Sequence, residues 1–413
     1  MYMIPLSWAL RQTLKAGYRL SDLKADILAA FVVSLIALPL SMALAIAIGL
    51  PPQHGIYTAI VAGIAAALFG GSLFQVSGPT AAFVVILIPI VTDFGLQGLI
   101  WCQILAGCLL ILFSILKFGR FIHYIPNPVI IGFTSGIALV LASISLKDFM
   151  GLPKVPYLSM HFTDINLPTT FIGIMTLFFM LSAKRFFKFI PSPLLGVLGG
   201  TLIGVALSQW GYPIHTIGSE FSGGIPHSAP RLQMPLLPTL EEFSAFLFPA
   251  FTIAMLAALE SLLSAKLADK MTGTAHHSNA ELSGIGIANV LCGLTTGIPA
   301  TAAIARTATN IQSGAKSPLA AILHGVFILL YILLLAPLIN YIPMSALAAV
   351  LVLTAYHMSH WQQFREGLHA SITDRFILLT CFLLTVCVDM VAAIAVGILL
   401  AALFAWSKRS IFN

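Results

Sequence analysis

The feature that most constrains the fold is a series of apolar runs, each about as long as a helix that crosses a bilayer. Such runs recur from Ile27 to the end of the chain, and stretches such as Leu99–Leu116 and Ile322–Leu338 are apolar all round rather than on alternate residues. Crossing a hydrocarbon core takes about 20 helical residues. A membrane β-barrel would need short segments of alternating polarity instead. The chain is therefore predicted to be an all-α polytopic membrane protein.

The composition agrees with this prediction, because 59% of the 413 residues are hydrophobic and 8% are charged. A typical soluble domain carries about 25% charged residues. The net charge of +6 is spread over short loops between apolar runs, which argues against nucleic-acid binding and favours a role in membrane orientation. The five cysteines lie scattered inside apolar runs without metal-ligand or disulfide spacing, so we expect core packing and no cofactor.

Apolar runs and breakers divide the chain into about fourteen expected transmembrane segments. Their approximate centres are residues 38, 63, 85, 107, 136, 178, 200, 254, 287, 306, 328, 350, 381 and 398. With the N-terminus in the cytosol, most Lys and Arg residues fall on the cytosolic side, as the positive-inside rule requires. We therefore expect a multi-pass protein of a bacterial-type inner membrane, with both termini in the cytoplasm.

The expected organisation is two repeats joined by an external linker rich in Pro and Gly. The segments are a cytosolic N-terminal part (1–25), a first repeat (26–208), the linker (209–242), a second repeat (243–408) and a cytosolic end (409–413). The N-terminal part is mixed and basic, without the apolar core and small-residue cleavage site of a signal peptide, and is expected to lie at the membrane interface.

The repeat is predicted from two pairs of matching prolines. Ser77–Ala82 resembles Gly297–Ala302 with Pro79 and Pro299 in register, and Ile-Pro pairs ending at Pro126 and Pro343 open two further segments. Seven segments per half is an odd number, so the second half must enter the membrane from the opposite side. Such inverted repeats are typical of secondary transporters. Chance similarity between proline-containing apolar stretches is the alternative explanation.

Both proline sites predict helices that start inside the membrane. The run from Pro79 to about Ile90 is too short to span, because about twelve helical residues rise only about 18 Å. Similarly, Gly297-Ile298-Pro299 breaks the chain before a possible helix over Ala300–Gln312. Proline suits a first helical turn, where its missing N–H is not needed. The alternative is a pair of full-length helices kinked at proline.

Two half-helices whose N-termini meet at the midplane direct unpaired N–H groups and positive dipole ends into one cavity, which favours an anion. Thr80 and Thr301 would add hydroxyl donors there. Arg306, about two turns beyond the second proline, would add a full positive charge. The sequence therefore predicts an anion site between these two helix starts.

Glu260 is the other ionisable residue that falls clearly inside a predicted span, and intramembrane charge indicates function by default. It could pair with Arg306 or bind a proton or cation that is coupled to transport. Ser264 lies one turn later on the same face and would suit a second oxygen ligand. A purely structural Glu260–Arg306 ion pair is the alternative. Asp93, near a predicted helix end, is expected to be exposed.

Taken together, these residues resemble the sulfate permease (SulP) family of anion transporters and exchangers, from about Asp22 to Phe404. The most specific stretches are Leu38–Gly49, Pro51–Tyr57, Phe69–Ser72, Ser77–Phe83, Glu260–Ser264 and Gly297–Lys316. The resemblance implies fourteen helices in two inverted repeats of seven, divided into a core domain and a gate domain. It also implies an elevator-type motion of the core past the gate, and a homodimer.

The same resemblance implies where the substrates bind. The anion site maps onto Pro79, Thr80, Ala81, Thr301, Ala302 and Arg306, and the cation or proton site maps onto Glu260 with Ser264 one turn on. The sequence departs from most members because it ends at Asn413 without a cytosolic STAS domain, which leaves open any regulation or dimer contact that depends on that domain. A natural short form and a trimmed chain both agree with this.

The leading hypothesis is therefore secondary active transport of sulfate or bicarbonate, with Glu260 as the coupling-proton site; a glutamate there tilts the expectation away from sodium. A dicarboxylate–proton symporter using the same site is the closest alternative. An anion channel or an exchanger of the same fold is another. No catalytic constellation in the sequence supports a membrane enzyme.

Overall fold

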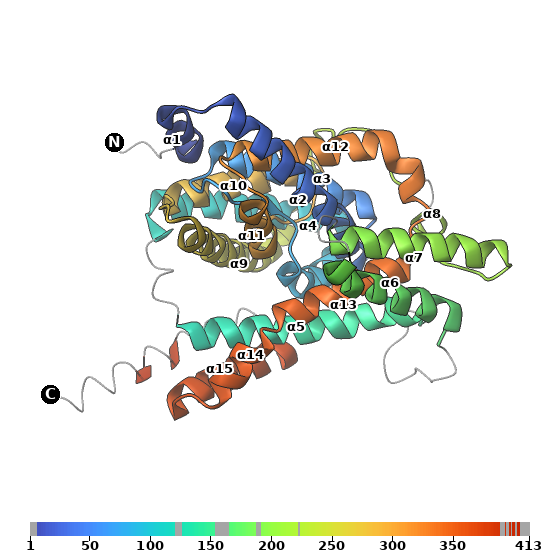
Figure 1. The fold of residues 1–413 in the computed structure, drawn as a ribbon. Helices are drawn as coiled ribbons and strands as arrows, with labels where there is room; N and C mark the ends of the chain where they lie inside the picture. Colours follow the sequence, from blue (N-terminus) through green and yellow to red (C-terminus); the bar gives the residue numbers. More distant parts are fainter. Residues whose placement is uncertain are drawn as a thin grey trace.

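The computed structural model describes residues 6–119, 126–152, 165–186, 191–221 and 224–388, with a few residues between 393 and 404. Nearly all of this part is helical, which confirms the all-α prediction (Figure 1). The helices are α1 (Trp8–Ala16), α2 (Leu20–Ala47), α3 (Pro52–Phe69), α4 (Ala82–Ile115), α5 (Asn127–Met150), α6 (Leu167–Phe186), α7 (Ser192–Gln209), α8 (Ile217–Glu220), α9 (Leu240–Thr272), α10 (Ser278–Leu294), α11 (Ile304–Gln312), α12 (Leu319–Ile339), α13 (Met344–Met358), α14 (Trp361–Leu368) and α15 (Ile372–Cys387). Two short strands, β1 (Ser77–Gly78) and β2 (Thr301–Ala302), form the sheet.

The predicted segments coincide with these helices, except the segment near residue 398, which lies mostly outside the described residues. Seven described helices are long and apolar enough to cross a membrane. The segments centred near 85 and 107 both lie in α4, where Gly95 breaks the helix with a non-helical backbone (φ 64, ψ −166). A positive φ at this point is readily adopted only by glycine, so α4 consists of a short first part ending at Phe94 and a longer second part.

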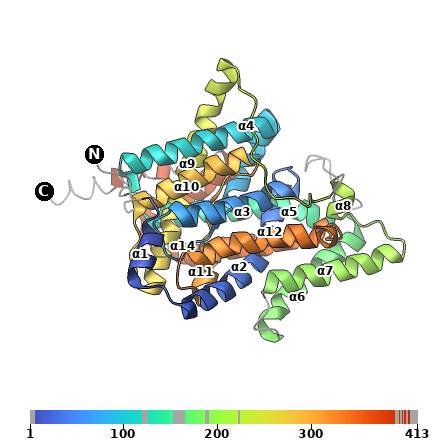
Figure 2. The same cartoon turned by 90° about the horizontal axis from the view of Figure 1, so that it is seen from above.

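The helices form two packed groups, which confirms the predicted division into core and gate. In the core group, α2, α3, α4, α9, α10 and α12 pack on one another, and α11 lies against α2 and α9. In the gate group, α5 packs on α13 and α15, and α6 packs on α7 and α13. Figure 1 shows the gate helices α5, α13, α14 and α15 below the core group, and Figure 2 shows the arrangement from above.

Proline placement explains where the matching helices of the two repeats begin. Pro126 and Pro343 are the N-cap residues of α5 and α13, with nearly identical backbone angles (φ −68, ψ 146 and φ −68, ψ 142). The ring fixes φ and the extended ψ keeps the residue out of the helix, so the helix begins at the next residue. Both prolines therefore open a helix, as predicted, and their equivalence in the two repeats stays a prediction.

The N-terminal part forms a short helix that lies against the core group. The backbone N–H groups of Ser7 and Ala9 donate to the carbonyls of Phe69 and Gly70 at the end of α3. Behind it, the hydroxyl of Tyr18 donates to Asp26 at 2.7 Å. These bonds fix the chain that precedes α2.

A buried carboxylate then ties α2 to the start of α12. Asp26 is fully buried and accepts bonds from the N–H groups of Lys316 (2.6 Å) and Ser317 (3.1 Å) and from the Ser317 hydroxyl (2.5 Å). A carboxylate at a helix N-terminus also compensates the positive end of the helix dipole. This contact holds the α11–α12 connection to α2.

Candidate functional site

The two strands bring the two proline sites together in the core group. β1 pairs with β2 in antiparallel register, with Ser77 opposite Ala302 and Gly78 opposite Thr301. Each strand leads within a few residues into a short helix, the first part of α4 and α11. The two predicted half-helices therefore start close to each other, and the β1–β2 pair connects the segments that lead into them.

The helix starts differ from the prediction. The helices begin at Ala82 and Ile304 rather than at Pro79 and Ala300. Before α11, Thr301 and Ala302 use their backbone groups in the strand pair, whereas Pro79 and Thr80 lie between β1 and α4 and belong to neither element. The prolines therefore lie outside the first helical turns. Pro79 also follows its strand whereas Pro299 precedes its own, so the two prolines that align in sequence are not structurally equivalent.

Neither half-helix has a side chain that caps its N-terminus. The N-cap residues are Ala81 and Ala303, and neither makes a side-chain capping bond. The first N–H groups of a helix have no partner within the helix, and the dipole concentrates partial positive charge there. In α4 the N–H groups of Phe83 and Val84 already donate to the carbonyls of Thr80 and Ala81, at 3.2 and 3.1 Å. What both helix ends offer a negatively charged ligand is therefore mainly the positive end of the helix dipole.

Arg306 adds a full positive charge to this arrangement. Its side chain is 2% exposed, and one guanidinium nitrogen, Nη2, donates to the carbonyl oxygen of Pro79. The Nε and Nη1 atoms are buried and have no partner in the part of the chain that the structure describes. Each unmade bond of a buried donor costs about 1–3 kcal/mol. An anion between these donors and the helix ends would remove that cost.

Glycine makes the room that the guanidinium occupies. A Cβ atom added at Gly78 would lie 2.5 Å from Nη1 of Arg306 and 3.3 Å from both Cζ and Nη2. No side chain can be accommodated at that separation without moving the guanidinium. Gly78 on β1 therefore determines where the Arg306 donors point.

Glu260, on α9, lies beside the same strands and keeps partial exposure. Its Oε2 accepts a hydrogen bond of 2.9 Å from the hydroxyl of Thr80. The structure has no ion pair between Glu260 and Arg306, although their charges are close enough to interact. Thr80 therefore links the acidic group to the start of the first half-helix.

The other predicted site residues are turned toward α9 and α11. The hydroxyl of Thr301 contacts Ser261 Oγ at 2.8 Å and donates to the Ala257 carbonyl at 3.2 Å. Ser264 is fully buried and donates to the hydroxyl of Thr307 at 3.1 Å. The structure thus brings together seven of the predicted residues, Pro79, Thr80, Ala81, Thr301, Ala302, Arg306 and Glu260. Ser264 lies outside this group and bonds to Thr307, the residue after Arg306. Direct binding of the anion by Thr301 stays a prediction.

Sequence reasoning missed the residues that hold the strands. Ser261 accepts from the Ala302 N–H at 3.2 Å, and Thr307 accepts from the Val76 N–H at 3.2 Å. The signal that could have revealed Ser261 is its position next to Glu260, at the helical spacing that faces both strands.

Buried amides hold the extended segments before each strand. Asn289 clamps the peptide groups of Ala300, accepting from its N–H and donating to its carbonyl, both at 2.9 Å. Gln75 donates to the Ser261 carbonyl at 2.9 Å, and Asn310 donates to the Phe74 carbonyl at 2.8 Å. The bonds to Ala300 and Phe74 satisfy backbone groups that neither helix nor sheet satisfies, and the bond from Gln75 ties its segment to α9.

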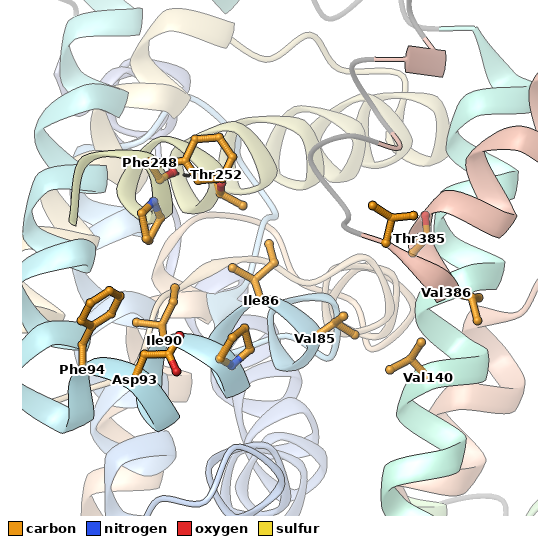
Figure 3. Close-up of a pocket in the computed structure, with 13 residues that line it drawn as sticks. Val85, Ile86, Ile90, Asp93, Phe94, Val140, Phe248, Thr252, Thr385 and Val386 are labelled. Atoms are coloured by element: carbon orange, nitrogen blue, oxygen red, sulfur yellow. Dashed lines mark hydrogen bonds between the residues drawn. The ribbon is translucent and has the colours of Figure 1, made fainter. Parts of the chain in front are cut away.

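A cavity of about 280 Å³ lies between the core and gate groups. Figure 3 shows Val85, Ile86, Ile90 and Asp93 of α4 and Thr252 of α9 on one side, with side chains of α5 and α15 on the other. Among the described residues, no group of three or more His, Cys, Asp or Glu side chains could hold a metal ion.

Comparison with known proteins places this geometry among transporters. The model of the Sulfate permease family matches residues 23–381. The chain is 42% identical over 404 residues to YvdB of Bacillus subtilis (strain 168), provisionally named a sulfate transporter, covering 94% of this chain and 74% of the relative. It is 30% identical over 407 residues to the bicarbonate transporter BicA of Synechocystis sp., covering 94% and 71% respectively. The solved transmembrane domain of a cyanobacterial BicA superposes with a TM-score of 0.81 at 30% identity, covering 91% of this chain and 98% of that one.

Proposed function

The chain belongs to the sulfate permease family of anion transporters, and from this premise we propose that it moves sulfate or bicarbonate across the membrane by proton-coupled symport. The relatives named for sulfate and for bicarbonate transport support this substrate range. The apolar helices make the chain a multi-pass membrane protein.

The observation that carries the proposal is the donor set around the β1–β2 pair. Two helix N-termini without a side-chain cap lie within a few residues of the Nε and Nη1 atoms of Arg306, which have no partner among the described residues. The helix ends contribute partial positive charge, and the two guanidinium atoms are donors that share a full positive charge. In a low-dielectric interior such donors stabilise an oxyanion much more than they would in water.

Charge balance supports the coupling of a proton. Arg306 and an ionised Glu260 together carry no net charge, so an incoming monoanion would leave a buried net charge of −1. Uptake of a proton by Glu260 would restore neutrality, which matters because an uncompensated buried charge is costly. The Thr80–Glu260 bond supports this coupling, since it joins the proton site to the start of α4.

The division into two helix groups supports an elevator-type mechanism. All the site residues belong to the core group, and the cavity separates part of that group from α5 and α15. Movement of the core along the gate would expose the site to each side in turn. We further propose a homodimer in a bacterial-type inner membrane, with the N-terminal helix on the cytoplasmic face.

The test is uptake into proteoliposomes under imposed pH gradients, with radiolabelled sulfate, bicarbonate and fumarate. We expect an inward proton gradient to drive accumulation of sulfate or bicarbonate, and Arg306→Ala to abolish it. Glu260→Gln should abolish gradient-driven accumulation while anion binding persists. Arg365→Ala is the matched control, because this arginine lies on α14, away from the site.

Several outcomes would change the proposal in distinct ways. Uptake of fumarate alone would keep the site and make the protein a dicarboxylate symporter. Flux that never accumulates substrate would indicate a channel, and uptake that requires sodium rather than a proton gradient would replace the coupling ion. Wild-type pH dependence in Glu260→Gln would remove that residue from coupling.

A further inference from the structure

The cavity between the core and gate groups has an unusual lining for an anion pathway. Most of its walls are Val, Ile, Phe and Pro side chains. Among the described residues, the polar groups that line it are Asp93, Thr252 and Thr385, and none of them is basic. The one charged side chain among these lining residues therefore has the same sign as the proposed substrate.

This cavity is lined by residues of α4 and α9, the two helices that also carry or adjoin the candidate site. On α4, the stretch from Ala82 to Asp93 rises about 17 Å, and Val85 lies about 5 Å along it. On α9, Thr252 precedes Glu260 by about 12 Å. An anion that moves between the site and this side of the protein would pass the cavity wall, with Asp93 at its far end (Figure 3).

A contribution to the stability of the fold does not explain the position of Asp93. It lies in the last turn of the first part of α4, directly before the break at Gly95. Partial negative charge gathers at a helix C-terminus, so a carboxylate there is unfavourable. Asp93 is exposed and has no hydrogen-bond or ion-pair partner in the described part of the chain. Neither a capping nor a packing role accounts for it.

We propose that Asp93 and the apolar walls act as a charge filter that admits monovalent anions of the bicarbonate class in preference to divalent anions such as sulfate. The proposal rests on the proposed function, since it assumes that an anion reaches the Arg306 site through this cavity. A single carboxylate repels a dianion twice as strongly as a monoanion. Apolar walls add to the discrimination, because the cost of removing an ion from water rises steeply with its charge.

The repulsion predicts a specific relation between the two substrates. Asp93 lies about 17 Å along α4 from the start of the helix beside the Arg306 site. Over that distance, with an effective dielectric constant of roughly 20 to 60, neutralising the Asp93 carboxylate should raise the concentration of a monoanion at the site about two- to five-fold. The factor for a dianion is the square of that for a monoanion, about four- to twenty-five-fold. Salt should weaken both effects, because the distance exceeds a Debye length of about 10 Å.

The experiment compares wild type and Asp93→Asn in proteoliposomes at low and high salt. Bicarbonate and sulfate are the probes, measured as initial uptake rates or, for an anion that is not moved, as competitive inhibition. We expect wild type to prefer bicarbonate and Asp93→Asn to raise kcat/KM for sulfate by about the square of the factor for bicarbonate. Glu241→Gln is the matched control, because this exposed carboxylate begins α9 without lining the cavity.

Equal factors for the two anions, an unchanged preference, or the same effect in Glu241→Gln would each overturn the filter. A wild-type preference for sulfate would overturn it as well. Failure of the proposed function has a different signature, since wild type would then take up no anion at all. Uptake without the square relation would leave the transporter in place and remove only the role of Asp93.

Discussion

Replacing Gly78 with alanine tests whether the strand pair sets the position of the Arg306 donors. The new Cβ would lie 2.5 Å from Nη1, about 1 Å closer than an ordinary contact, so the guanidinium must retreat. Its bond to the Pro79 carbonyl is then lost or bent. A hydrogen bond to a charged group contributes about 1.5–3 kcal/mol. We therefore expect anion affinity to fall about 10- to 100-fold.

The assay combines anion binding and uptake KM with thermal unfolding in detergent. Gly78 has a φ of +158°, which a residue with a Cβ rarely adopts, so Gly78→Ala should also lower the unfolding temperature, and thermal unfolding records that backbone cost separately from the loss of binding. A double-mutant cycle with Arg306→Met isolates the mechanism, because residues that act through one contact are not additive. In the Arg306→Met background, the alanine should cause little further loss.

The reasoning is refuted if Gly78→Ala weakens binding by the same factor with and without the arginine. That result would mean that the alanine distorts the backbone of β1 rather than displacing the guanidinium. Wild-type affinity in the single variant would be equally damaging, because it would show that the guanidinium has room to move without consequence.

Three further predictions concern the scaffold around the site. Asn289→Leu leaves both peptide groups of Ala300 unpaired and should lower the free energy of unfolding by about 2–5 kcal/mol, measured by denaturant titration in detergent. Burial, reinforced by the hydrogen bond to Asp26, raises the pKa of Tyr18. The contribution of Tyr18 to stability is therefore fully present below the ordinary tyrosine pKa of about 10 and is lost as the pH rises above it. In unfolding curves at alkaline pH, wild type should lose stability more steeply than Tyr18→Phe. Gly55→Ala places a Cβ 1.9 Å from a carbonyl oxygen of α2 and should abolish the monodisperse peak in size-exclusion chromatography.

Much of the fold could be predicted from sequence because the bilayer imposes a simple rule on length and polarity. Apolar runs located the helices, and prolines located several helix starts, as Pro126 and Pro343 show. The half-helix nature of the first part of α4 was also predictable, since the run after Pro79 is too short to span. In these cases the deciding physics is local to the segment.

The site could be predicted only in part, because its geometry depends on contacts between the two repeats. Arg306 and Glu260 were recognisable as charges inside spans, which need a functional or structural reason. The pairing of β1 with β2 was not recognisable, since two residues carry no strand period. Nor were Ser261 and Asn289, because a single small polar residue in an apolar helix looks the same whether it holds a strand or packs against a neighbour.

The separation of Glu260 from Arg306 argues against a purely structural ion pair between the two residues. Two opposite charges in direct contact would satisfy each other and leave few donors for a substrate. Here the carboxylate binds the Thr80 hydroxyl, and the guanidinium binds the Pro79 carbonyl. Each charge is thus held by a neighbouring residue of one short segment, and two guanidinium donors have no partner in the described part of the chain. The proposed binding of an anion to these donors, coupled to a proton on Glu260, requires this open arrangement, because a closed ion pair would occupy both groups.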